Sequence, residues 1–133
     1  MRFSKALLLL PVLALAGCAN VGGLPGAAKA APLAIDRVQM TAAGHFVDLR
    51  YRVTDVEAAA AAFKPGAEYV LVDESTGRKM LVPTTAKLGV LRQSRGLKTG
   101  RTYFMLFMNG GVKPGSLVTA EIAGYKFRHL RIQ

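Results

Sequence analysis

Basic side chains are concentrated in one part of this sequence, where they could bind anions. Between Glu74 and Glu121 the chain has no acidic residue. Five basic residues of that interval fall within residues 87–101, namely Lys87, Arg92, Arg95, Lys98 and Arg101. A guanidinium group can make two parallel hydrogen bonds to a carboxylate or phosphate, so the three arginines are the better candidates for a specific anion. The alternative interpretation is a basic, soluble surface that has no dedicated ligand.

A second charged group follows the period of a β-strand. In residues 45–54, Asp48, Arg50 and Arg52 are spaced two apart, so they share one face of the strand. This stripe could dock a partner. We favour the other interpretation, in which Asp48 and Arg50 form a structural pair that links neighbouring strands.

Histidine and methionine side chains could together hold copper, as they do in periplasmic copper carriers of the β-sandwich type. A metal-handling carrier is therefore the alternative function for this chain. The spacing does not support it, because Met105 and Met108 are three residues apart and point to opposite faces of a strand. Met80 and Met105 are expected to fill the core. We expect no metal site and no cofactor, although the available ligands include His45, His129, Met40, Met80, Met105 and Met108.

Catalytic motifs are missing from the sequence. It contains no Gly-x-Ser-x-Gly elbow, no His-Glu-x-x-His pair and no glycine-rich phosphate loop, so we do not expect an enzyme. No stripe of aromatic residues lies among the basic ones, and we expect no nucleic-acid partner.

The single cysteine, Cys18, follows a segment that is typical of a secretory signal peptide. Arg2 and Lys5 precede an apolar run over residues 6–16, which is shorter than the roughly 20 residues that a membrane-spanning helix needs. The run ends in Leu15-Ala16-Gly17-Cys18, which resembles the lipobox of bacterial lipoproteins. The resemblance implies that the Cys18 thiol takes a diacylglyceryl group as a thioether and that cleavage after Gly17 makes Cys18 the acylated first residue. The alternative is an ordinary secreted protein with a chance cysteine near its cleavage site.

The residues after Cys18 predict a tether and a location. Ala19 follows the cysteine, whereas an aspartate at this position resembles a signal for retention in the inner membrane, so we expect a periplasm-facing anchor in the outer membrane. Residues 18–33 are mostly Ala, Gly and Pro and should form a flexible tether that spans about 20 Å. Loss of Arg2 and Lys5 with residues 1–17 would lower the formal net charge from +10 to +8.

The remaining residues, 34–133, are expected to form one β-sandwich domain. In residues 45–54, apolar side chains alternate with polar ones, as in an antiparallel strand with one exposed face. Thr54 and Glu57 match a capping box, which predicts a short helix near residues 55–63. Residues 102–108 are apolar on both faces, so we expect a central strand there. Turn signals separate strands expected at 35–42, 45–54, 68–73, 79–82, 87–93, 102–108, 117–123 and 125–132.

Seven or eight short strands with this spacing predict an all-β fold, an antiparallel sandwich of the immunoglobulin-like or fibronectin-like type. The segments 47–55, 82–83, 87–93 and 103–109 also resemble small bacterial envelope lipoproteins of uncharacterised function. That resemblance implies a compact periplasmic β-domain and no particular activity. We therefore expect a lipid-anchored module that binds an anionic envelope component or an envelope protein.

Overall fold

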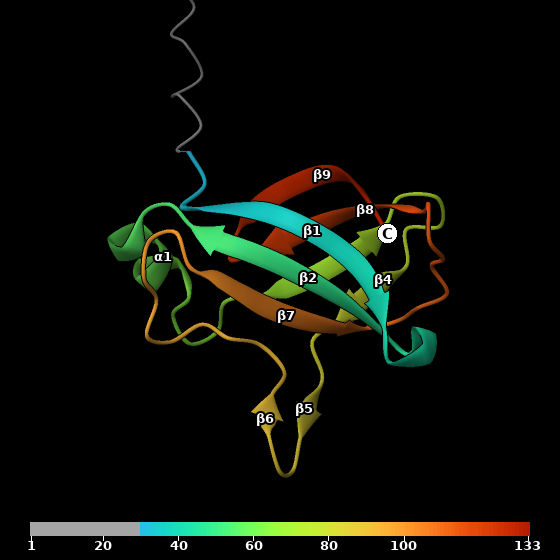
Figure 1. The fold of residues 1–133 in the computed structure, drawn as a ribbon, viewed down its shortest axis with the longest axis horizontal. Helices are drawn as coiled ribbons and strands as arrows, with labels where there is room; N and C mark the ends of the chain where they lie inside the picture. The colour runs from blue at the N-terminus through green and yellow to red at the C-terminus, as the bar shows by residue number, and fades with distance from the viewer. Residues whose placement is uncertain (1–29) are drawn as a thin grey trace, which may run out of the picture.

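The computed structural model describes residues 30–133, which form antiparallel β-sheets and one short α-helix. One sheet has the strand order β1-β2-β7, and the other has the order β4-β3-β8-β9. Strands β5 and β6 form a hairpin that extends away from both sheets (Figure 1). The strands are β1 (Leu33–Thr41), β2 (Phe46–Val53), β3 (Tyr69–Asp73), β4 (Lys79–Leu81), β5 (Thr84–Thr85), β6 (Gly89–Val90), β7 (Thr102–Met108), β8 (Leu117–Ile122) and β9 (Tyr125–Arg131).

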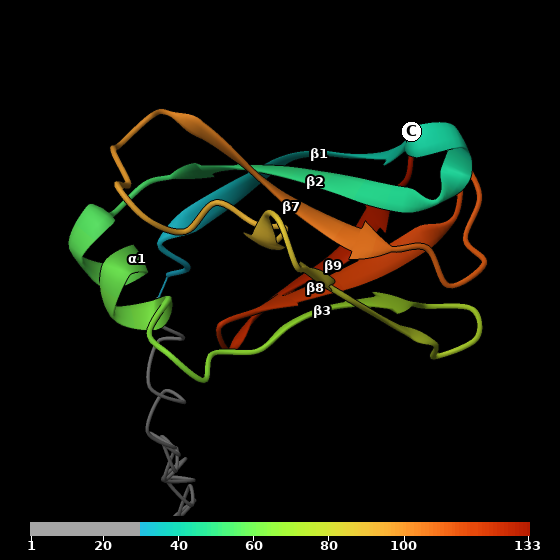
Figure 2. The same cartoon turned by 90° about the horizontal axis from the view of Figure 1, so that it is seen from below.

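The two sheets lie one above the other as separate layers (Figure 2). The alternating side chains of β2 fill the space between them, because Leu49 and Tyr51 are fully buried. Phe107 from β7 and Leu71 from β3 pack into the same core from the two layers. This arrangement confirms the all-β antiparallel prediction and the inward face that the sequence predicts for residues 45–54.

The layers are joined on one side, where β1 contacts the two residues that follow β9. Val38 forms a parallel bridge with Ile132, and the Met40 amide donates to the Gln133 carbonyl over 3.1 Å. On another side the chain itself crosses between the sheets. It leaves β4 of one sheet, forms the β5–β6 hairpin, and then pairs with β7 of the other sheet.

Several predicted boundaries were wrong. Leu33 was assigned to the tether, but it begins β1 and is only 3% exposed. The predicted strand over 87–93 contains only β6 and an isolated bridge at Arg92. The part of the chain that is described has nine strands rather than seven or eight, because this region is divided into very short pieces.

The helix and the central strand also differ from their predictions in detail. The predicted helix is α1 (Val56–Ala62), and its N-cap is Asp55 rather than Thr54. The Asp55 carboxylate accepts from the Ala58 amide at 3.0 Å, while the Thr54 hydroxyl is directed to the Ala31 carbonyl. The centre of its sheet is β2, and β7 is flanked on its far side only by the short segment 91–93.

Candidate functional site

The pairing of residues 91–93 with β7 determines where Arg92 points. The Leu106 amide donates to the Leu91 carbonyl, and the Gln93 amide donates to the Phe104 carbonyl, both at 2.9 Å. Arg92 therefore lies opposite Met105, which is fully buried. Because directly opposed residues of antiparallel strands share a face, the Arg92 side chain is directed toward the space between the sheets.

Arg92 rests on an aromatic cluster from three elements. Its guanidinium carbon lies 4.0 Å from the centre of the Tyr69 ring, a cation–π contact. The Tyr69 ring lies 5.8 Å from the ring of Phe63, which in turn lies 5.9 Å from that of Tyr51. The Tyr51 hydroxyl donates to the Gln93 carbonyl, so the cluster also fixes the residue that follows Arg92.

Two buried polar atoms of this cluster have no hydrogen-bond partner among the described residues, namely the Tyr69 hydroxyl and the Nε of Arg92. Burial raises the pKa of the Tyr69 hydroxyl, and the Arg92 charge opposes that shift. Burial also raises the pKa of Tyr51, and Tyr69 and Tyr103 add to the effect. The hydroxyls of Tyr51 and Tyr69 thus stay protonated beside the Arg92 guanidinium.

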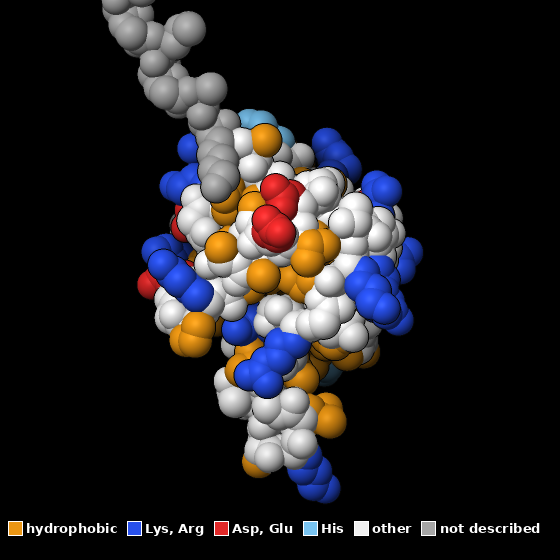
Figure 3. Space-filling model, turned by 90° about the vertical axis from the view of Figure 1, so that its left-hand side faces the viewer, with side chains coloured by type: hydrophobic (Ala, Val, Ile, Leu, Met, Phe, Trp, Pro, Cys, Tyr) orange, Lys and Arg blue, Asp and Glu red, His pale blue; other side chains and the backbone are white. Residues whose placement is uncertain are grey.

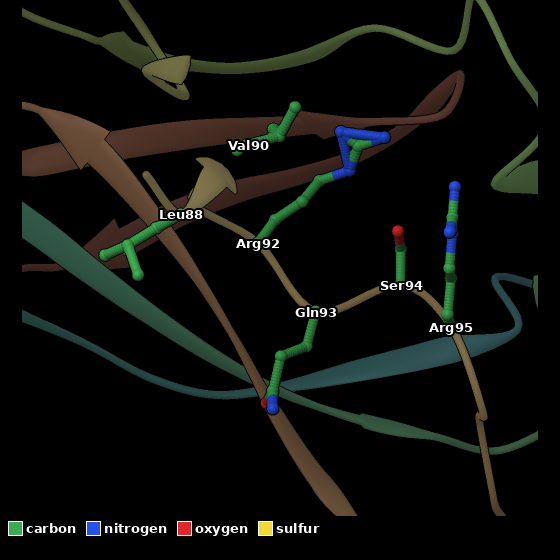
Figure 4. A pocket seen from close by; sticks show the side chains of 7 residues that line it. Leu88, Val90, Arg92, Gln93, Ser94 and Arg95 are labelled. Atoms are coloured by element: carbon green, nitrogen blue, oxygen red, sulfur yellow. The ribbon is translucent and has the colours of Figure 1, made fainter. Parts of the chain in front are cut away.

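Two pockets flank Arg92, and both use Val90 as a wall. The first, of about 470 Å³, lies beside β3 and β4, and we call it the Arg92 pocket. It is lined by Glu68, Tyr69, Val70, Lys79, Leu81, Val82, Thr84, Val90 and Arg92. The second, of about 500 Å³, is lined by the residues from Leu88 to Arg95 other than Leu91. In that pocket Arg92, Ser94 and Arg95 project to one side of the chain while Gln93 projects to the other (Figure 4).

The other basic residues of the segment 87–101, which we call the basic loop, point into solvent. Lys87, Arg95, Lys98 and Arg101 are all exposed. The turn that carries Lys98 is fixed by its backbone amide, which donates to the Tyr103 hydroxyl at 2.7 Å. Figure 3 shows basic side chains along both edges of the face toward the viewer, on its lower part and on the protruding hairpin, with acidic side chains above its centre and at its left edge. The structure thus brings Arg92 and Arg95 to one pocket and leaves Lys87 apart on the hairpin.

The charged stripe of β2 is divided between two ion pairs. Asp48 is only 3% exposed, and its carboxylate accepts from Arg50 Nε and Nη2 at 2.9 and 2.8 Å. Arg50 also lies over the Phe104 ring. Arg52 instead pairs with Asp36 of β1 at 2.7 Å. These contacts occupy the charges of the stripe, but Asp48 and Arg50 pair with each other within β2, and it is the Arg52–Asp36 pair that joins neighbouring strands.

The candidate metal ligands are dispersed. Met80 and Met105 lie in the core, as the sequence predicts, and Met108 is exposed. The Nδ1 of His129 lies 3.0 Å from Glu74 Oε2 on the surface, and His45 is an exposed turn residue. Within residues 30–133, no group of three or more His, Cys, Asp or Glu side chains could hold a metal ion.

The residues of the predicted anchor are outside the described part of the chain. This applies to Gly17, Cys18, the apolar run over 6–16 and most of the tether. Among the described helices, none is long and apolar enough to cross a membrane.

Sequence reasoning missed the role of Tyr69. Its place in the run Glu68–Asp73 predicts only a strand. Nothing in the local pattern signals its contact with Arg92, because the two residues meet only when the sheets pack. Comparisons with protein families, with curated proteins and with solved structures found no match to this chain.

Proposed function

We propose that this protein is a binding module of the bacterial cell envelope that contacts an anionic envelope component or protein through its basic loop. The observation that carries the proposal is the set of exposed basic residues at 87, 95, 98 and 101, with no acidic residue between Glu74 and Glu121. The loop is fixed at several points, since Gly100 donates to the Val53 carbonyl and Gln93 to the Phe104 carbonyl. A surface of like charges held in place attracts anions without paying the full cost of ordering a loop.

The proposal includes a lipid anchor at Cys18 and a location on the periplasmic face of the outer membrane. Its support is the sequence Leu15-Ala16-Gly17-Cys18-Ala19 after an apolar run that is too short to span a bilayer. Each methylene of an acyl chain contributes ~0.8 kcal/mol on entering the bilayer, so two or three chains would hold the domain firmly.

We also propose that the sandwich is immunoglobulin-like. The sheet β1-β2-β7 corresponds to strands A, B and E of that fold, and β3-β8-β9 corresponds to C, F and G. In this scheme β4 is the additional strand that lies beside C, and residues 91–93 take the edge position beside E. The domain would then belong to an architecture that many cell-surface binding modules use.

The test of binding uses the purified full-length protein without acyl chains, so that an anchor cannot insert into a bilayer, and two anionic probes, isolated peptidoglycan and vesicles that contain lipopolysaccharide. We expect co-sedimentation with at least one probe, and we expect the bound fraction to fall as salt rises, because screening weakens contacts between exposed charges. Cross-linking in whole cells covers the case of an acidic protein partner. Failure to bind either probe, together with no cross-linked envelope protein, would overturn the proposal.

The anchor has its own test, the variant Cys18→Ser. The serine hydroxyl cannot take a diacylglyceryl group as a thioether, so we expect no incorporation of labelled fatty acid and a precursor that keeps its first 17 residues. The measurement is metabolic labelling followed by mass spectrometry of the intact chain. A Cys18→Ser protein that still carries the label would contradict the lipoprotein assignment.

A further inference from the structure

The guanidinium of Arg92 is positioned but unpaired. The guanidinium group lies over the Tyr69 ring. The backbone of Arg92 is held in place because the residues on either side of it pair with β7. Among the ion pairs of residues 30–133, none involves Arg92, and its Nε is buried without an acceptor. The terminal nitrogens of Arg92 are not among the buried atoms without a partner, so they are accessible in the pocket walls. Because the accessible terminal nitrogens of this cation have no carboxylate partner among the ion pairs of residues 30–133, they favour an incoming oxyanion.

The remaining walls of the Arg92 pocket determine what kind of anion fits. Val70, Leu81, Val82 and Val90 form an apolar lining, and the volume of about 470 Å³ is within the range of small-molecule sites. Lys79 adds a second positive charge. Glu68 also lines the pocket, and its negative charge would repel a dianion more strongly than a monoanion. The pocket therefore suits a single negative charge that is attached to an aliphatic group.

We propose that the Arg92 pocket binds a carboxylate that carries an aliphatic chain. The carboxylate accepts hydrogen bonds from the guanidinium of Arg92, and the chain lies against Leu81, Val82 and Val90. Tyr69 acts as a positioning residue, because its ring supports the guanidinium from the face opposite to the ligand. This site shares Arg92 with the basic loop but does not depend on the proposed envelope function, since it needs none of Lys87, Arg95, Lys98 and Arg101.

Titration of the purified full-length protein, followed by NMR of its ¹H–¹⁵N resonances, tests the site. The probes are hexanoate, which represents a fatty acid, and N-acetyl-leucine, which represents the carboxyl terminus of a peptide. We expect saturable shifts at residues 68–70, 79–82 and 90–92 with one or both probes, and the tighter of the two identifies the source of the carboxylate. Acetate, which lacks the chain, and hexanol, which lacks the charge, should bind at least tenfold more weakly. Tighter binding of hexyl phosphate than of hexanoate would overturn the carboxylate assignment.

Variants separate recognition by Arg92 from a purely structural role. We expect Arg92→Met to weaken binding tenfold or more, because a charge-assisted pair is lost, and Arg92→Lys to weaken it several-fold, because lysine cannot make the two parallel bonds. Leu81→Glu places a negative charge on the pocket wall, and Leu81 is 58% exposed, so the substitution spares the core while abolishing binding. Tyr69→Phe keeps the ring and should change affinity less than twofold, whereas Tyr69→Leu should weaken binding. These two variants distinguish a supporting ring from a contacting hydroxyl.

Arg95→Met is the matched control, because Arg95 belongs to the basic loop but does not line the Arg92 pocket. Its affinity for hexanoate or N-acetyl-leucine should match that of the unaltered protein. No saturable binding of either probe, or binding by Arg92→Met and Leu81→Glu that is as tight as that of the unaltered protein, would overturn the site. If the protein binds the carboxylate probes but no envelope component, the proposed function is overturned and this inference stands. If it binds an envelope component but neither carboxylate probe, this inference is overturned and the proposed function stands.

Discussion

Three tyrosines contribute to the aromatic cluster beneath Arg92, and they differ in what their hydroxyl groups contact. The Tyr51 hydroxyl donates to the Gln93 carbonyl, and the Tyr103 hydroxyl accepts from the Lys98 amide. The Tyr69 hydroxyl is buried and has no partner in the described part of the chain. The strand period predicts that Tyr51 is buried, but hydroxyl contacts depend on loops that return from far along the sequence. They could not be predicted from local pattern.

Replacement of single hydroxyls should therefore have opposite effects on stability. Tyr51→Phe leaves the Gln93 carbonyl without its donor and should lower the free energy of unfolding by about 1 kcal/mol. Tyr69→Phe removes a buried hydroxyl that has no partner, so it should leave stability unchanged or raise it by up to about 1 kcal/mol. Urea unfolding of both variants under the same conditions measures the difference. Equal destabilisation by the two variants would contradict the hydroxyl contacts described above.

At the scale of elements, local sequence patterns predict the structure correctly where one residue type has one local role. The turn between β3 and β4 is an example, since the run Glu74–Arg78 predicts a hairpin and the structure contains it. The signals failed where two residues compete, as at the start of α1, where Thr54 and Asp55 can both cap a helix. They also failed at 87–93, because a strand there requires a partner, and only three residues reach β7.

The β3–β4 turn predicts a pH dependence of stability. Asp73 accepts from the hydroxyls of Thr76 and Ser75 at 2.7 and 2.9 Å, and from the Ser75 amide. The Thr76 hydroxyl bond and then the Ser75 bonds hold the pKa of Asp73 below its ordinary value of 3.8. A carboxylate whose pKa is lower in the folded state stabilises the fold above its unfolded pKa, and that contribution is lost as pH falls through the folded pKa.

Acid unfolding of Asp73→Asn tests this contribution. The variant should be less stable than the unaltered protein at pH 6, because the neutral amide is a weaker acceptor than the carboxylate. The difference should shrink between about pH 5 and pH 2, as Asp73 becomes protonated in the unaltered chain. Thermal unfolding midpoints across this range provide the measurement. A difference that stays constant with pH would show that the Asp73 charge does not stabilise the turn.

At the scale of the whole molecule, the sequence predicts a β-sandwich and a basic segment, but not where on the sandwich the basic segment lies. Residues 87–101 belong to the connection that runs from β4 to β7. Their charges therefore lie on the part of the sandwich where the chain passes from one sheet to the other. The direction of Arg92 follows from its pairing opposite Met105, which is a property of the assembled sheet. The same assembly pairs Asp48 with Arg50 and Arg52 with Asp36, which leaves the basic loop as the main candidate surface.

The most direct test of the account compares two variants of equal charge. The first replaces Lys87, Arg95, Lys98 and Arg101 with glutamine. The second replaces Arg37, Lys64, Lys113 and Arg128, which are also exposed but lie outside the basic loop. Both remove four positive charges, and neither alters a core residue or a member of the ion pairs within residues 30–133. The measured quantity is the fraction of full-length protein that co-sediments with the envelope probe bound by the unaltered protein. We predict at least a tenfold loss of affinity for the first variant and a much smaller loss for the second. Equal losses would show that net charge alone drives binding, and would contradict a binding surface at the basic loop.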